Sequence, residues 1–195
     1  MENSKVNKMV KIAMLAAVSA LLMYIEIPLW FAPPFYEIDL SEVPVLIGAF
    51  SMGPVAGTLI ELVKILVKLV IKGTQTYGVG ECANFFIGCA LVLPAALVYK
   101  KNKTQKGAII GMVVGTLVMT FIGCFINAYV MLPAYSAAFK MPIDALVAMG
   151  TKVNKNITSM STFVFFAVVP FNFIKCVIVS VITFLLYKRV RTILK

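Results

Sequence analysis

Long apolar segments alternate with short polar ones along the whole chain. The apolar segments cover residues 12–27, 43–72, 80–99, 107–131 and 160–187. One membrane-spanning helix needs about 20 apolar residues, so segments of this kind fit a lipid bilayer. A helix that is apolar on every side is typical of burial in lipid or in a large core. The pattern predicts an all-α membrane protein with a single membrane domain over residues 1–195.

The segment 43–72 is 30 residues long, roughly half as long again as one span requires. Gly53-Pro54 interrupts it, and such a pair marks a turn. The segment is therefore either one long tilted helix or two helices, 43–52 and 54–72, joined by a tight turn. The first alternative gives five spans and the second gives six.

The positions of the basic residues separate these alternatives. Cytoplasmic loops of membrane proteins carry an excess of Lys and Arg. Five spans place the basic loop 100–106 and the C-terminal tail outside, against this rule, whereas six spans place both inside. We therefore predict a six-transmembrane-helix bundle with both termini cytoplasmic and spans at 12–27, 43–52, 54–72, 80–99, 107–131 and 160–187. The inside then holds Lys5, Lys8, Lys11, Lys100, Lys101, Lys103, Lys106, Lys188, Arg189, Arg191 and Lys195, and the outside only Lys72, Lys140, Lys152 and Lys155.

Composition agrees with a membrane protein. Apolar residues make up 61% of the chain and charged residues 13%, against about 45–50% and about 25% in soluble domains. The net charge of +10 could indicate nucleic-acid binding. Because the basic residues lie at the ends of apolar segments, we instead expect membrane lipid headgroups as their partners and no nucleic acid.

Several kinds of chemistry are not supported by the residues. The chain has no histidine, and its four cysteines lie singly inside apolar segments, without the short paired spacings of metal sites. No metal, cofactor or catalytic group is expected, and a histidine-dependent hydrolase is excluded. The sequence has no Gly-x-x-x-x-Gly-Lys-Ser/Thr phosphate loop, so uphill transport would need energy from a partner or an ion gradient.

Polar residues inside a membrane are costly, and each is a candidate functional residue. Counting about 20 residues outward from the basic cluster at each cytoplasmic helix end gives the depth of these residues. They fall in the outer part of three spans and in the aromatic, acidic loop 28–44, and the inner half has almost none. This set comprises Glu81, Asn84, Asn127, Asn172 and Lys175 in the spans, with Phe35, Glu37 and Asp39 in the loop.

A pocket open only to the outside follows from this distribution. A channel needs polar lining through both halves of the membrane, and a complete secondary transporter usually binds near the midplane. Amides donate and accept hydrogen bonds, and aromatic rings offer faces for stacking. We expect capture of a flat, largely apolar ligand with a hydrogen-bonding edge. The alternative for any single residue is a polar cap on a helix end, although Asn172 and Lys175 share one helix face at i, i+3.

Two further patterns have more than one interpretation. Glu61, Lys64 and Lys68 lie on one face of the third span, where they form an internal ion pair or contribute to ligand binding. Small residues at i, i+4 spacing let helices approach closely, either within the bundle or against a partner. Such ridges occur at Gly107, Gly111 and Gly115 in the fifth span, and at Ala13 and Ala17 in the first.

Several sequence segments together resemble a known family. They are the small-residue pair of the first span and the motifs FYEIDLSEVP (35–44), ELVK (61–64), GECANF (80–85), INAYVMLP (126–133) and PFNFIK (170–175). The chain resembles the substrate-binding S component of energy-coupling factor (ECF) vitamin transporters, and most of all the riboflavin-specific branch. The resemblance extends over nearly the whole chain. The spacing of Asp-x-Ser-x-x-Pro at 39–44 and Asn-x-x-Lys at 172–175 is its most specific feature.

The resemblance implies a riboflavin-binding subunit of an importer in the bacterial cell membrane. Its partners are a transmembrane T component and two cytoplasmic ATPases. It implies that Asn127, Asn172 and Lys175 bind the flavin ring and that the loop near Phe35 and Glu37 covers it. Ala13 and Ala17 then meet the T component. Binding of flavin mononucleotide stays open, as does an S component for another vitamin or a purine-like ligand. A membrane enzyme acting on lipid is disfavoured because paired carboxylates and histidine are missing from the inner side.

Overall fold

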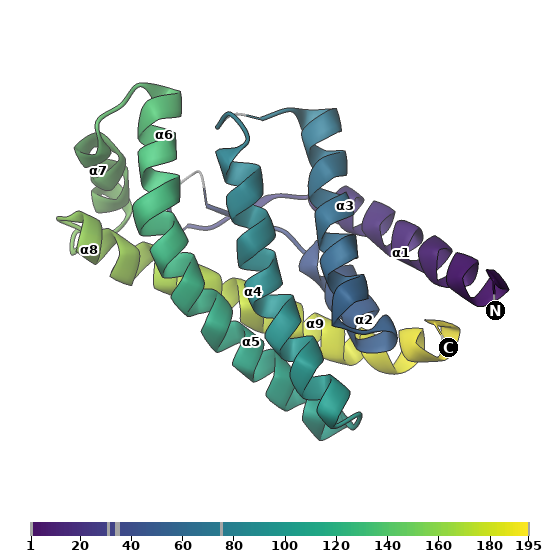
Figure 1. Cartoon of the computed structure of the whole chain (residues 1–195). Coiled ribbons are helices and arrows are strands. Elements are labelled where there is room, and N and C mark those ends of the chain that lie inside the picture. Colours follow the sequence, from purple (N-terminus) through teal and green to yellow (C-terminus); the bar gives the residue numbers. More distant parts are fainter. Residues whose placement is uncertain (1, 31, 34–35, 75, 195) are drawn as a thin grey trace.

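The computed structural model of the chain describes residues 2–30, 32–33, 36–74 and 76–194, with side chains described from residue 5 to residue 187 in these ranges. The helices are α1 (Glu2–Leu22), α2 (Glu42–Met52), α3 (Pro54–Lys72), α4 (Val79–Lys101), α5 (Gln105–Ile126), α6 (Leu132–Phe139), α7 (Ile143–Val153), α8 (Met160–Phe163) and α9 (Val169–Leu194). Two π-helical turns, η1 (Asn127–Met131) and η2 (Val164–Val168), connect α5 to α6 and α8 to α9. Two short strands, β1 (Ile27–Pro28) and β2 (Glu37–Ile38), form an antiparallel hairpin. The fold is a helix bundle with this hairpin across one end (Figure 1).

The segment 43–72 forms two helices, as the six-span alternative requires. Gly53 separates α2 from α3 with a φ of 98°, a conformation that glycine adopts without steric cost. Pro54 begins α3, where its missing N–H costs no hydrogen bond. The turn at Gly53, the α4–α5 loop and both termini gather toward one end of the molecule in Figure 1, whereas the hairpin and α7 lie toward the other.

The first helix differs from the prediction. It covers Glu2–Leu22 rather than 12–27, because Ile27 and Pro28 belong to the hairpin and pair with Ile38 and Glu37. Its charged N-terminal turns are helical although they lie before the apolar segment. The predicted spans 107–131 and 160–187 lie inside longer continuous helices, and the stretch after residue 139 contains a separate short helix, α7.

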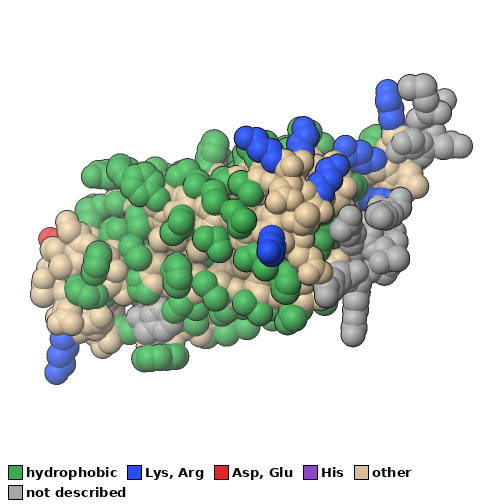
Figure 2. Space-filling view, turned by 90° about the horizontal axis from the view of Figure 1, so that it is seen from below, with side chains coloured by type: hydrophobic (Ala, Val, Ile, Leu, Met, Phe, Trp, Pro, Cys, Tyr) green, Lys and Arg blue, Asp and Glu red, His purple; other side chains and the backbone are tan. Residues whose placement is uncertain are grey.

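Three helical stretches of the described chain are long and apolar enough to cross a membrane: Val79–Lys101, Gln105–Phe139 and Met160–Tyr187. α2 has 11 residues, about 16 Å of helix, against the roughly 30 Å of a hydrocarbon core. α3 is longer but carries four charged side chains. Hydrophobic side chains cover most of the surface in Figure 2, and basic ones gather toward one end.

The glycine ridge of α5 packs within the chain's own bundle. A Cβ atom at Gly111 would lie 2.5 Å from the carbonyl oxygen of Ala95 in α4, and a Cβ atom at Gly115 would lie 2.4 Å from the carbonyl oxygen of Leu91. These contacts allow α4 and α5 to pack with their backbones nearly touching. The interpretation of this ridge as an internal packing surface is confirmed.

Because backbone cannot move aside as a flexible side chain can, Gly111→Ala should destabilise the protein by about 1–3 kcal/mol. Thermal unfolding in detergent would measure the loss. Val113→Ala is the control, since Val113 is 55% exposed on the same helix and its truncation should change the free energy of unfolding by less than about 0.5 kcal/mol. Equal effects of the two substitutions would contradict the close α4–α5 contact.

Candidate functional site

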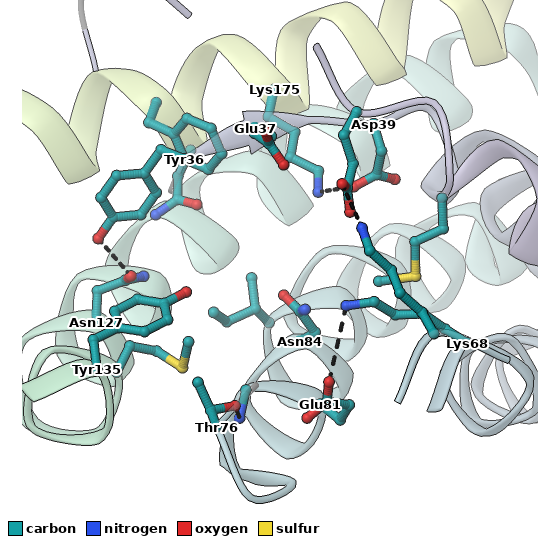
Figure 3. A pocket seen from close by; sticks show the side chains of 18 of the residues that line it. Tyr36, Glu37, Asp39, Lys68, Thr76, Glu81, Asn84, Asn127, Tyr135 and Lys175 are labelled. Carbon is teal, nitrogen blue, oxygen red and sulfur yellow. Dashed lines mark hydrogen bonds and ion pairs between the residues drawn. The ribbon is translucent and has the colours of Figure 1, made fainter. Parts of the chain in front are cut away.

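A cavity of about 860 Å³ lies under the hairpin, at the end of the bundle away from the termini. Its volume is within the usual range of small-molecule sites, about 300–1,000 Å³. The hairpin, α3, α4, η1, α6 and α9 all contribute side chains to it (Figure 3). Its polar lining consists of Glu26, Tyr36, Glu37, Asp39, Lys68, Lys72, Thr76, Glu81, Asn84, Asn127, Tyr135, Asn172 and Lys175.

An ion pair joins the loop after the hairpin to α9. The Nζ atom of Lys175 lies 2.9 Å from Oδ2 of Asp39, and the other carboxylate oxygen accepts the backbone N–H of Ser41 at 2.8 Å. Burial alone would raise the pKa of Asp39, but the positive charges of Lys175 and Lys64 outweigh burial and hold it below its usual range. Asp39 is therefore a carboxylate at neutral pH, and it orients the Lys175 ammonium at the wall of the cavity.

A second group of charges, centred on Lys64, fixes the loop after the hairpin through Ser41. Lys64 of α3 is 1% exposed, and its ammonium lies 2.8 Å from Glu42 and 2.7 Å from Glu61. It also donates a hydrogen bond to the hydroxyl of Ser41 at 3.3 Å. The hydroxyl of Ser19 in α1 donates to the carbonyl oxygen of the same serine. The internal ion pair expected for Glu61 and Lys64 is present, whereas Lys68 points into the cavity.

Two buried amides, Asn127 and Asn172, also line the cavity. Asn127 is held at both ends: its Oδ1 accepts the Tyr36 hydroxyl at 2.8 Å, and its Nδ2 donates to the carbonyl of Gly123 at 2.8 Å. Asn172 is 3% exposed, and its buried amide nitrogen has no hydrogen-bond partner among the described residues. A buried donor without a partner costs about 1–3 kcal/mol, and a ligand acceptor that reached this nitrogen would remove that cost.

The mouth of the cavity is charged. Lys72 pairs with Glu26 at 2.5 Å, and Lys68 lies 3.9 Å from Glu81, which also accepts a hydrogen bond from Thr74 at 2.8 Å. Burial and then the neighbouring Glu26 carboxylate raise the pKa of Glu37, while Lys72 opposes them. Each lysine at the mouth thus has a carboxylate close by.

Apolar side chains complete the lining. Five of them are methionines, which are flexible and polarisable and adapt to the shape of a ligand. Phe171 and Tyr135 add aromatic surface beside Tyr36, whose ring centroid is 4.9 Å from that of Phe171. The methionines are Met23, Met119, Met131, Met141 and Met149.

Seven of the eight ligand-binding residues predicted from sequence line this one cavity: Glu37, Asp39, Glu81, Asn84, Asn127, Asn172 and Lys175. The eighth, Phe35, lies outside the described residues. Ala13 and Ala17 are exposed on α1, while Ala16 and Ala20 face the core. The described residues contain no cluster of three or more histidine, cysteine or acidic side chains suited to a metal ion.

The sequence analysis missed Tyr36 and Thr76 as lining residues, and it left Lys68 between an internal ion pair and ligand binding. Tyr36 belonged to an aromatic loop that gave no indication of which ring points inward. Lys68 follows Lys64 by one turn of α3. The sequence does not show that Lys68 lines the cavity while Lys64 belongs to the buried ion cluster.

Residues 7–187 match the family described as the ECF transporter, substrate-specific component. The riboflavin transporter RibU of Staphylococcus aureus is 34% identical over 99% of this chain and 95% of its own length. The riboflavin transporter FmnP of Bacillus subtilis is 31% identical over 96% of this chain and 93% of its own. A solved S component of a bacterial ECF transporter superposes with a TM-score of 0.75 and 32% identity, covering 100% of this chain and 99% of that one.

The chain belongs to the substrate-specific component family of ECF transporters, and it is a multi-pass protein of the bacterial cell membrane and not an enzyme.

Proposed function

We propose that this chain binds riboflavin in the cavity under the hairpin and serves as the binding subunit of an ECF importer. The observation that carries the proposal is the unpartnered amide nitrogen of Asn172, buried beside Asn127 and Lys175 in a cavity large enough for a three-ring ligand. The names of the two relatives, at 34% and 31% identity, support riboflavin as the ligand.

The chemistry of the lining suits a flavin. One edge of the flavin ring system carries carbonyl oxygens and a ring N–H, and these groups match amide and ammonium partners. Asn172 and Lys175 would donate to the carbonyls, while Asn127, fixed by Tyr36 and Gly123, would need no rearrangement to accept. The flat apolar part of the ring would lie among the methionines and aromatic rings, and the polyhydroxyl chain would face the charged mouth with Glu37, Glu81 and Asn84. Flavin mononucleotide would place its phosphate near that mouth.

The topology that fits this function is a single membrane domain with six spans and cytoplasmic termini. The grouping of the termini, the Gly53 turn and the α4–α5 loop at one end supports it, and so does the strongly basic character of that loop. The cavity would then open outward. We further propose that α1, with Ala13 and Ala17 exposed, docks on a transmembrane T component that works with two cytoplasmic ATPases.

Substitution of the amide and the ammonium tests the ligand site. Asn172→Ala should raise the dissociation constant for riboflavin about three- to tenfold, because one neutral hydrogen bond is lost. Lys175→Ala should raise it about ten- to a hundredfold, because the lost bond is charge-assisted and Asp39 loses its partner. Quenching of flavin fluorescence by the purified variants measures both constants.

The exposed residues Asn156 and Lys152 give matched controls, since Asn156→Ala and Lys152→Ala remove the same groups outside the cavity. Both controls should bind riboflavin like the unmodified chain. If neither Asn172→Ala nor Lys175→Ala changes the affinity, the ligand binds elsewhere.

Cysteine labelling tests the topology. On a background in which the four native cysteines are replaced, Lys103→Cys should resist a membrane-impermeant thiol reagent in intact cells, because the α4–α5 loop is cytoplasmic. Tyr77→Cys, 85% exposed before α4, should react readily. Strong labelling at position 103 would exclude the six-span arrangement.

Bulky substitution on α1 tests the docking face. Ala17→Leu should leave riboflavin binding intact and abolish uptake in cells that contain the partner subunits, since the exposed face would no longer fit a neighbouring helix. Ala20→Leu is the contrast, because Ala20 is buried and the change should lower thermal stability instead. Normal uptake by the Ala17→Leu variant would show that this face does not meet the T component.

A further inference from the structure

A second hollow lies on the surface of the bundle between α5 and α9, and it shares no lining residue with the ligand cavity. It is a groove of about 420 Å³ with almost entirely apolar walls. Its rim is formed by side chains that are half-exposed, among them Val113, Val181 and Leu185. Met112 and Thr116 are buried and form its floor. The lining residues are Ile109, Met112, Val113, Thr116, Leu117, Phe173, Val177, Ser180, Val181, Phe184 and Leu185.

The length and direction of the groove match a lipid chain. On α9 its walls extend from Phe173 to Leu185, about 18 Å at 1.5 Å per residue. This is close to half of the roughly 30 Å hydrocarbon thickness, or one leaflet. Because α5 and α9 both cross the membrane in the proposed topology, the groove runs parallel to the acyl chains of that leaflet.

Unpaired positive charge lies at one end of the groove. Lys106 precedes Ile109 by three residues and Val113 by seven, so it lies on the same face of α5, one turn beyond the lining. Lys100, Lys101 and Lys103 are exposed nearby in the sequence, and none of these four lysines forms an ion pair with another described residue. The sequence contains no acidic residue between Glu81 and Asp144. Basic side chains gather toward one end of the apolar face in Figure 2.

We propose that this groove binds one anionic phospholipid, with an acyl chain between α5 and α9 and the phosphate at Lys106 and Lys103. The apolar walls explain why the ligand has a hydrocarbon chain, and the unpaired lysines explain why its headgroup is anionic. Lysines beside a membrane surface each favour anionic lipid by an amount equal to about a fivefold change in affinity. The groove shares no lining residue with the flavin cavity, so lipid retention can be measured without riboflavin.

Competition between two lipids tests the proposal. The purified protein is offered equal amounts of phosphatidylglycerol and phosphatidylcholine with the same acyl chains, and retained lipid is counted by native mass spectrometry. The expected result is one retained phosphatidylglycerol per chain. Lys103→Gln and Lys106→Gln should each weaken this retention about fivefold, whereas Lys140→Gln, an exposed lysine in the α6–α7 connection, should not.

Filling the groove separates a defined site from a surrounding lipid shell. Val113→Trp should abolish retention, and Phe121→Trp, on an exposed part of α5 outside the groove, should leave it unchanged. Leu117→Trp repeats the test if the Val113 variant does not fold, and riboflavin binding reports folding in every variant. Equal retention of the two lipids would overturn the proposal, and so would retention that Val113→Trp and Leu117→Trp leave intact.

Discussion

The ion cluster of Glu42, Lys64 and Glu61 is the constraint on which the cavity end of this molecule depends. A buried ammonium is strongly destabilising unless carboxylates surround it, and removal of one member of such a group typically costs about 3–5 kcal/mol. Lys64 is surrounded because α2 and α3 are separate helices that lie side by side. The turn at Gly53 makes that arrangement possible. The cluster in turn positions Ser41, and through it Asp39 and Lys175.

The cavity therefore has a rigid side and an adaptable side. Charge pairs and hydrogen bonds fix the side chains of Asp39, Lys175 and Asn127 before any ligand arrives, which lowers the entropy lost on binding. Methionines form much of the remaining wall and can repack at little cost. The unpartnered nitrogen of Asn172 is the exception in this ordered wall.

Physical reasoning from sequence grouped residues that do line one cavity, because depth in a membrane is a one-dimensional quantity. Counting from basic helix ends placed Asn172, Lys175 and Asn127 at one level, and helices in a bundle bring residues of equal depth together. Gly53-Pro54 identified the helix break because both residues have strong local preferences. The end of α1 was predicted too late, since pairing of Ile27 and Pro28 with the hairpin is a long-range interaction that apolar periodicity does not reveal. The inward direction of Tyr36 depends in the same way on Asn127, 91 residues away.

The π-helical turn η1 has a consequence for how much of one helix can face a ligand. The cavity is lined by Asn127, Met131, Tyr135 and Phe139, four residues apart along a single continuous helix. In a regular α-helix, residues at this spacing drift around the axis by about 40° per step, so the last would have rotated about 120° out of the cavity. A π turn advances less around the axis for each residue, and it therefore corrects the phase where the drift begins. One inserted residue thus keeps Tyr135 and Phe139 directed at the cavity along with Asn127 and Met131. Deletion of Ala128 from η1 would turn the whole of α6 away from the site without removing a side chain that lines it.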